Sequence, residues 1–232
     1  MVRARHQRRP VRAAGLAAAG LVLSACGQVH PGAAAVVGDT RISMDEVDAL
    51  SAAYCRATVA IADSEGEPVT PTEGISSRRT VLGALLQREI ARQAAASLGV
   101  EAEPSTYIAD ERSFQPLLDA VGDAYADDVA RLVRVTGEAS ALQVAIGASQ
   151  LGGDVSNVDL QQAQQSGQEY ITEFGAGVDI EIDPRFGLTA DGQVLAETGS
   201  LSVPVSQEAV AVDSPADVAI RIGDLPAALV CR

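Results

Sequence analysis

Histidine, lysine and the large aromatic side chains are scarce in this sequence or missing from it. The chain of 232 residues has two histidines, His6 and His30, and no lysine or tryptophan. A domain formed by the residues after His30 therefore cannot use a Ser-His or Cys-His mechanism, and it lacks the commonest ligand of catalytic zinc. Because only 3% of the residues are aromatic, a platform that stacks sugars or nucleic-acid bases is not expected.

Acidic residues are abundant, with 31 Asp and Glu in total. A pair of carboxylates is the one catalytic arrangement that this composition leaves open. No spacing in the sequence singles out such a pair, and most of these acids are expected on the solvated surface. The sequence therefore predicts a protein that is not an enzyme and that has no metal and no cofactor.

The first 25 residues have the layout of an export signal. A head with five arginines precedes the small apolar run of residues 13–23, and that run is shorter than the roughly 20 apolar residues that span a bilayer. Arg8 and Arg9 lack the flanking residues usual for twin-arginine export, so the route stays open.

Removal of this signal makes the rest of the chain strongly acidic. The five arginines of the head leave with it, so 12 Arg remain against 31 Asp and Glu, a formal net charge of −19. Such a surface repels nucleic acid and anionic lipid headgroups. No nucleic-acid partner is expected, and membrane contact has to come from an attached lipid.

The apolar run ends in four residues that resemble the lipobox of bacterial lipoproteins, namely Leu23, Ser24, Ala25 and Cys26. In that family a diacylglyceryl group is attached to the cysteine sulfur, and cleavage leaves the cysteine as the first residue. The resemblance implies lipidation of Cys26, an extracytoplasmic location and attachment to the cell membrane through the lipid. The alternative is a buried cysteine in an alanine-rich helix. Residues 26–34 are expected to be a short tether.

Cys55 and Cys231 are the two cysteines that remain. An even pair in an exported protein predicts a disulfide, because the extracytoplasmic space permits one. Two separate buried thiols are the alternative. The bridge would close most of the chain into one loop and fasten its last residues to the first long helix.

Apolar residues recur at helical spacing over residues 43–174. Ser43 and Glu46 have the spacing of a capping box, which predicts that the first helix begins there and ends near Ile61. Further helices are expected over residues 76–100 with a left-handed cap at Gly99, over 104–111, from 116 to about 133, over 137–151 and over 158–174. The stretch after Gly137 either continues the helix before it or breaks from it.

Short extended segments flank these helices. Val36 and Val37 form a short run before a turn at Gly38 and Asp39. Residues 178–187 alternate apolar and acidic side chains, as in a strand with one face in water. Each segment is too short to be stable alone, so we expect the two to meet in one sheet.

The C-terminal third is expected to contain more short strands and irregular chain. Asp191 and Gly192 predict a hairpin, and Val218, Ile220 and Ile222 predict a last strand. Arg185 is expected to pair with an acid of its own turn, and a partner's carboxylate is the alternative. The fold class predicted is mainly α with a small β element (α+β), with about five helices.

Residues 36–42, Val-Val-Gly-Asp-Thr-Arg-Ile, precede a capped helix and then a long helix that closes with Leu-Gly-Val. Over about 34–100 this order resembles the N-terminal domain of SurA-like periplasmic chaperones. The run Asp-Pro-Arg-Phe-Gly at 183–187 and the terminal cysteine are similar to features of actinobacterial lipoproteins that carry this domain. The resemblance implies a single SurA-N-like domain over 35–232, with a β or irregular part from about 178.

The resemblance also implies a function, namely binding of unfolded or newly exported polypeptides in an apolar cradle between helices. In relatives of this family a parvulin prolyl isomerase domain often follows, but too few residues remain after Val178 for that domain. Isomerase activity therefore does not carry over. The competing class is a structural or accessory envelope lipoprotein that binds one specific partner. A broad, dynamic apolar groove favours the first class, and a small rigid patch favours the second.

Overall fold

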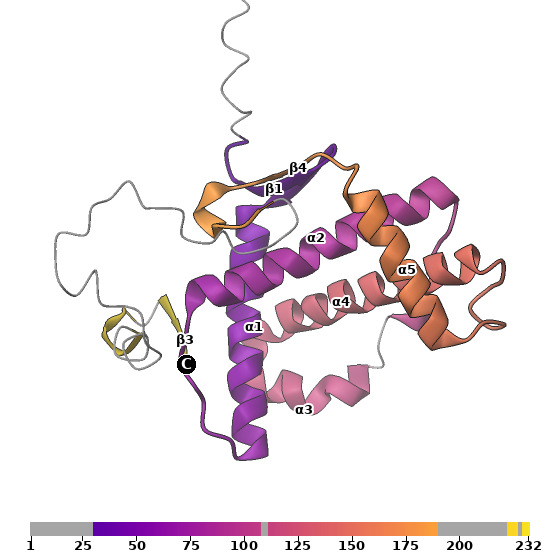
Figure 1. Cartoon of the computed structure of the whole chain (residues 1–232). Helices are drawn as coiled ribbons and strands as arrows, with labels where there is room; N and C mark the ends of the chain where they lie inside the picture. The colour runs from indigo at the N-terminus through magenta and orange to yellow at the C-terminus, as the bar shows by residue number, and fades with distance from the viewer. Residues whose placement is uncertain (1–29, 108–110, 190–221, 227–228) are drawn as a thin grey trace, which may run out of the picture. The chain divides into compact units, whose positions relative to one another are not determined.

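The computed structural model describes residues 30–107, 111–189, 222–226 and 229–232 (Figure 1). The chain divides into one unit that ends at Pro31 and a second unit from Gly32 to Arg232, and the elements below belong to the second. The signal peptide, most of the tether, the hairpin at 191–192, and Val218 and Ile220 lie outside the described residues.

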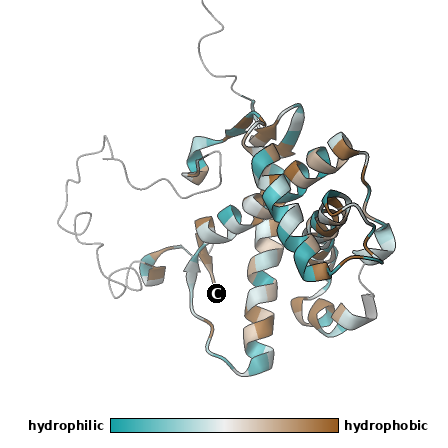
Figure 2. Cartoon of the chain, turned by 45° about the vertical axis from the view of Figure 1, so that its right-hand side comes forward, coloured by the Kyte–Doolittle hydropathy of each residue, from teal (hydrophilic) through white to brown (hydrophobic). Residues whose placement is uncertain are grey.

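The described part of the chain is mainly helical, in agreement with the predicted fold class. The long helices are α1 (Met44–Glu65), α2 (Gly74–Leu98), α3 (Glu111–Val121), α4 (Asp123–Gln150) and α5 (Leu160–Gly175). Helix α2 packs against α1, α4 and α5, and α5 crosses α4, with which it shares the most extensive contact between two described helices (Figure 1). Hydrophobic and hydrophilic residues alternate along the helices, as expected for helices with one buried face (Figure 2).

Two helix ends follow the capping signals in the sequence. Helix α1 begins where predicted, since the Ser43 side chain accepts a hydrogen bond from the Glu46 amide at 3.1 Å. Helix α2 ends at Gly99, which has the left-handed φ of 65° expected for such a cap. The predicted end of α1, near Ile61, was wrong by about one turn. The helix continues until Gly66, whose left-handed φ of 71° ends it.

The middle of the chain corrects two expected boundaries and decides a third that the sequence left open. The helix expected from residue 116 is divided at Gly122, whose φ of 81° ends α3 and begins α4. Helix α4 then runs through Gly137, where a Cβ atom would lie 3.0 Å from the Tyr107 carbonyl oxygen, so this glycine permits close packing and does not break the helix. Of the helix expected over 104–111, the described residues up to 107 show only the 3₁₀ turn η2, Pro104–Thr106.

Strands far apart in the sequence form one small sheet. Strands β1 (Ala33–Val37), β2 (Thr40–Ser43) and β4 (Ile180–Ile182) are antiparallel in the order β2-β1-β4. Val37 is opposite Ile180 and Ala35 is opposite Ile182, so the expected meeting of the two segments is confirmed.

The strand predicted over 178–187 is shorter than expected. It stops at Asp183, whose side chain accepts a hydrogen bond from the Arg185 amide and so caps the 3₁₀ turn η3 (Pro184–Phe186). Pro184 has no amide hydrogen to donate to a sheet. A second sheet pairs β3 (Thr72–Glu73) with β5 (Val230–Cys231). Ile222, expected in a strand, has a helical backbone.

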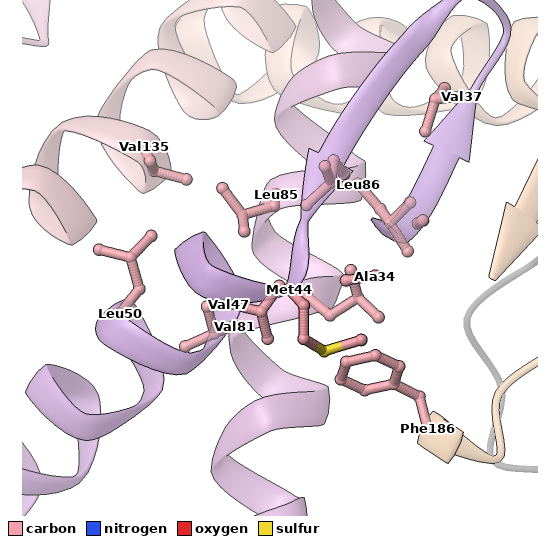
Figure 3. Packing of buried hydrophobic residues seen from close by; sticks show 13 residues of the cluster. Ala34, Val37, Met44, Val47, Leu50, Val81, Leu85, Leu86, Val135 and Phe186 are labelled. Carbon is pink, nitrogen blue, oxygen red and sulfur yellow. The ribbon is translucent and has the colours of Figure 1, made fainter. Parts of the chain in front are cut away.

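The largest hydrophobic cluster lies where the sheet meets α1 and α2 (Figure 3). Phe186 of η3 enters this cluster and is 1% exposed. Its ring lies near Met44 at the start of α1, and the Arg78 guanidinium carbon is 5.4 Å from the ring centroid. The buried phenylalanine therefore fixes the chain that leaves β4 on the first turns of α1 and α2.

Candidate functional site

The predicted lipidation site belongs to the part of the chain before residue 30. Leu23, Ser24, Ala25 and Cys26 lie before residue 30 and outside the described residues. Their prediction therefore rests on the sequence. Within the residues that the structure does describe, no helix has both the length and the apolar character needed to cross a membrane.

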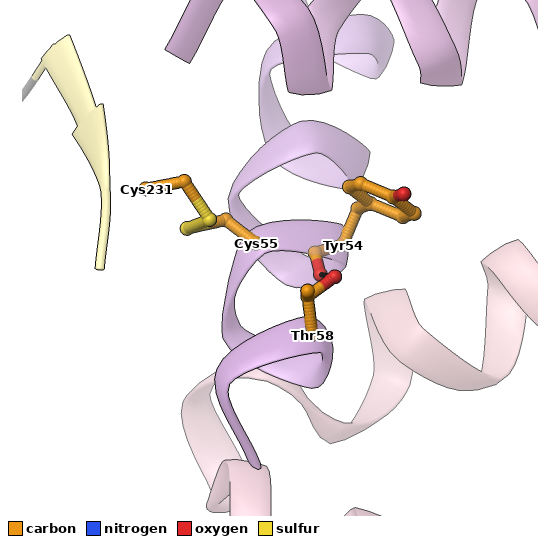
Figure 4. The surroundings of a disulfide bond; sticks show 4 residues. All are labelled: Tyr54, Cys55, Thr58 and Cys231. Atoms are coloured by element: carbon orange, nitrogen blue, oxygen red, sulfur yellow. Dashed lines mark hydrogen bonds between the residues drawn. A yellow bond between two sulfur atoms is a disulfide. The ribbon is translucent and has the colours of Figure 1, made fainter. Parts of the chain in front are cut away.

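Cys55 and Cys231 are joined by a disulfide (Figure 4). Cys55 lies in α1 and Cys231 in β5, and their α-carbons are 5.4 Å apart. Strand β5 pairs with β3, which leads directly into α2, so the disulfide fastens the last residues beside the start of α2. A cleft of about 660 Å³ adjoins the disulfide. Four charged residues line it, namely Asp48, Arg56, Arg78 and Arg232, and of these Arg78 and Asp48 pair at 2.6 Å.

A second hollow lies between α2 and α5, and we call it the α2–α5 groove. Its volume is about 660 Å³, which is within the range of about 300–1,000 Å³ typical of ligand sites. Helix α2 lines it with Gly83, Leu86, Gln87 and Ile90. Because these positions are three or four residues apart, they lie on one face of the helix.

The opposite wall of the α2–α5 groove comes from α5 and from the chain that leads into β4. Helix α5 contributes Gln168, Ile171, Thr172 and Gly175, and beyond it lie Ala176, Val178 and Ile180. Leu86 and Ile171 are buried at 5% and 6% exposure, while Gln87, Gln168 and Thr172 are exposed. The described lining therefore has an aliphatic floor and an uncharged polar rim.

The position of α5 is set by two glycines at its contact with α4. A Cβ atom on Gly147 would overlap the carbonyl oxygen of Ala163, and one on Gly167 would overlap that of Gln143. The two backbones can approach this closely only because neither glycine has a side chain. The Gln143 amide also donates a hydrogen bond of 2.8 Å to the Gln164 carbonyl across the same contact.

The charged residues of α2 lie on other faces of the helix and hold its neighbours. Arg92 makes two hydrogen bonds of 2.7 Å to the Glu138 carboxylate of α4, which raise the pKa of Arg92. Arg131 of α4 pairs with Glu46 of α1 at 2.6 Å. Burial, and then the positive charge of Arg92, lower the pKa of Arg88, which lies between these two pairs.

Chemically, the α2–α5 groove is suited to noncovalent contact with apolar groups. Among the residues that line it in the structure, none is a nucleophile activated by a base and none carries a charge. Across the described ranges, no three His, Cys, Asp or Glu side chains gather as ligands for a metal ion. What this site offers a ligand is aliphatic surface and amide or hydroxyl hydrogen bonds.

The sequence predicted apolar positions in α2 and α5 but missed the contact that brings the two walls together. Gly147 and Gly167 were not singled out. The signal available was an isolated glycine inside each helical pattern, which costs about 1 kcal/mol relative to alanine and is kept where packing requires it. Which backbone each glycine approaches is decided by the tertiary structure.

Comparisons with protein-family models, with curated proteins and with solved structures found no match for this chain.

Proposed function

We propose that this chain is a lipid-anchored extracytoplasmic protein that binds apolar segments of unfolded or newly exported polypeptides without catalysis. The α2–α5 groove is the observation that carries the proposal. Its floor is aliphatic, it is open to solvent at exposed polar residues, and its described lining has no charge. Ile90, Val178 and Ile180 are half-buried in this groove and are bordered by polar residues, an arrangement found at sites that bind proteins.

The lining of the α2–α5 groove suits a ligand of variable sequence. Ile90, Val178 and Ile180, which are half-buried, offer nonpolar contact, which depends on area more than on direction. Gln87 and Gln168 can each donate and accept hydrogen bonds, so they can follow the backbone of an extended segment. Gly83 leaves open space above its α-carbon, because no atom lies within 4 Å of the position its Cβ would take.

The sequence around Cys26 supports the anchoring part of the proposal. An arginine-rich head, a short apolar run and the residues Leu23, Ser24 and Ala25 precede this cysteine. A lipid on its sulfur would hold the domain at the membrane surface, where exported chains emerge. The resemblance of residues 34–100 to SurA-like chaperones supports the same activity.

The size of the α2–α5 groove favours a second candidate, an accessory lipoprotein that binds one specific envelope partner. About 660 Å³ holds a short segment and is not a broad cradle. One wall is also held in place, because α5 packs backbone to backbone on α4 at Gly147 and Gly167. A rigid wall favours one ligand shape over many.

The test uses the mature chain with Cys26→Ser, kept oxidised, in two assays. The first measures suppression of aggregation of an unrelated unfolded protein, and the second measures binding of extended peptides by titration. The variant Gly83→Leu places a side chain in the α2–α5 groove where space is free, and Gly83→Ala is the matched control with little added volume.

Suppression at near-stoichiometric ratios, with saturable binding of many peptides that Gly83→Leu weakens and Gly83→Ala does not, would support the chaperone-like function. Binding of no unfolded protein and no peptide would contradict it. In that case, retention of one specific envelope protein, again lost in Gly83→Leu, would support the accessory lipoprotein.

A further inference from the structure

The cleft beside the disulfide is lined by arginines, although the protein as a whole is acidic. Arg56, Arg78 and Arg232 line it. The acidic groups among its lining residues are Asp48, which pairs with Arg78, and the terminal carboxylate that Arg232 carries as the last residue of the chain. Positive charge therefore exceeds negative charge in the described lining, whereas the whole chain has a formal net charge of −14.

The disulfide places two of these arginines at one cleft. Arg56 follows Cys55 in α1, Arg232 follows Cys231 of β5, and the α-carbons of the two cysteines are 5.4 Å apart (Figure 4). Arg56 lies on the same face of α1 as the lining residue Asp48, because these positions are eight residues apart. Arg56 and Arg232 are exposed, and within the described ranges neither takes part in an ion pair or a side-chain hydrogen bond. Their guanidinium groups are therefore available to a ligand.

A buried hydroxyl without a partner also lines this cleft. Ser77 of α2 is 5% exposed, and its side chain makes no hydrogen bond to another described residue. The fully enclosed side-chain atoms that lack a partner in the described part of the chain belong to other residues, so the Ser77 hydroxyl is open to the cleft. Buried polar groups are normally hydrogen-bonded, so this hydroxyl has a donor to give to a ligand.

The N-terminus of α2 lies at the same cleft. Gly74 and Ile75, the first two residues of this helix, belong to the lining. The residue before them, Glu73, makes no side-chain cap hydrogen bond to the helix and is not part of the described lining. The partial positive charge at a helix N-terminus favours an anion. Guanidinium groups, a hydroxyl donor and this helix end therefore all favour the same kind of ligand.

We propose that the cleft beside the disulfide binds a phosphate monoester whose organic part is small and nonpolar. A phosphate monoester carries nearly two negative charges at neutral pH and accepts hydrogen bonds in several directions, so Arg56, Arg232 and Ser77 can bind it from different walls. A carboxylate carries a single charge, and its acceptors lie in one plane.

The rest of the cleft suits the organic part of such a ligand. Tyr125 and Leu229 belong to the lining and are 37% and 53% exposed, so they offer nonpolar contact. The volume of about 660 Å³ is enough for a small organic phosphate. The cleft shares no lining residue with the α2–α5 groove, so this proposal does not rest on the proposed function.

The experiment titrates phenyl phosphate into the mature Cys26→Ser chain, kept oxidised, at about 20 mM ionic strength. We expect saturable binding, which Arg56→Gln or Arg232→Gln weakens by at least about fivefold. Ser77→Ala should weaken it by about threefold without lowering the melting temperature, because no hydrogen bond within the protein is lost. The matched control Arg134→Gln removes an exposed arginine of α4 outside the described lining and should change the affinity less than about twofold.

Other ligands test the chemistry and the source of the phosphate. Benzoate, which has a carboxylate in place of the phosphate, should bind at least about fivefold more weakly than phenyl phosphate. Phosphatidylcholine vesicles that contain phosphatidic acid offer the same phosphate group on a membrane. We expect the protein not to bind them, because its acidic surface repels anionic headgroups.

Each outcome supports or overturns the proposal. Absence of binding by both phenyl phosphate and the vesicles would overturn it, as would equal losses in Arg56→Gln and Arg134→Gln. Benzoate that binds as tightly as phenyl phosphate would overturn the assignment to a phosphate. Vesicle binding that is lost in Arg56→Gln would support the site and identify a lipid headgroup as its ligand.

Two further measurements complete the test. Thermal unfolding checks that the variants are folded. Gly83→Leu, which fills the α2–α5 groove, should leave binding of phenyl phosphate unchanged. This proposal and the proposed function can therefore fail separately.

Discussion

Gly147 of α4 lies against Ala163 of α5, so close that a Cβ atom on Gly147 would overlap the Ala163 carbonyl oxygen. Gly167 makes the equivalent contact in the other direction, against Gln143. The position of α5 relative to α2, and hence the width of the α2–α5 groove, depends on this backbone contact.

Gly147→Ala should lower the free energy of unfolding by about 2 kcal/mol, because an added methyl group forces two packed backbones apart. Alanine favours a helix by up to about 1 kcal/mol over glycine, so the loss would appear despite better helix propensity. Urea unfolding measures it. Gly83→Ala is the control, since its Cβ meets no atom and the variant should be more stable. Equal stability of Gly147→Ala and wild type would contradict the close contact.

Cys55→Ser/Cys231→Ser should lower the free energy of unfolding by about 2–4 kcal/mol, because the disulfide closes a long loop in the unfolded chain. The two residues are 176 positions apart. Chemical denaturation of the oxidised wild type and of the double variant measures the effect. Adding a reductant to the double variant is the control and should change nothing. A wild type that is unaffected by reductant would show that the cysteines are not joined.

Phe186→Ala should lower the free energy of unfolding by about 3–5 kcal/mol, the usual cost of removing a buried phenylalanine. The side chain is 1% exposed and contacts the cluster formed by the sheet, α1 and α2. Phe186→Leu keeps most of the nonpolar volume and should lose much less. A loss below about 1 kcal/mol in Phe186→Ala would show that η3 does not pack as described.

The Asp183 carboxylate should stabilise the fold in a pH-dependent way. Its hydrogen bonds to the Arg185 side chain lower the pKa of Asp183 in the folded state. A carboxylate whose pKa is lowered by folding stabilises the folded state at pH values above its unfolded-state pKa of about 3.9. That stabilisation is lost as the pH falls through the folded-state pKa.

Urea midpoints of wild type and Asp183→Asn, measured from about pH 7 to pH 2, test this effect. We expect wild type to be the more stable at neutral pH and the difference to shrink below about pH 4. Arg185→Gln should remove part of the same difference, because it removes the first cause of the shift. A difference that stays constant across this range would contradict the assignment.

Cys26→Ser should abolish attachment of a lipid and move the protein from the membrane fraction to the soluble extracytoplasmic fraction. The sulfur of Cys26 is the predicted site of the diacylglyceryl group. Mass spectrometry of the mature protein, expressed in a lipoprotein-processing bacterium, measures the added lipid. Replacement of the other two cysteines is the control and should leave the lipid in place. A wild type without added mass would refute the lipobox assignment.

Local signals predicted the elements whose cause lies within a few residues. The capping box of Ser43 and Glu46 and the left-handed Gly99 determined the start of α1 and the end of α2. The boundaries that were wrong or left open depended on other parts of the chain or on competing glycines. Gly122 and Gly137 look alike in a helical pattern, but one ends a helix and the other packs under Tyr107.

The sequence by itself determined the fold class through the periodicity of its apolar residues. The shortness of the two strands predicted that β1 meets β4, and the even number of remaining cysteines predicted that Cys55 pairs with Cys231. Only the tertiary structure decided where the groove lies. The α2–α5 groove exists because Gly147 and Gly167 let α5 approach α4, while β4 and Phe186 hold the chain beyond α5 on the core. Such an arrangement depends on contacts between distant residues, and no local pattern specifies which distant backbone a glycine will meet.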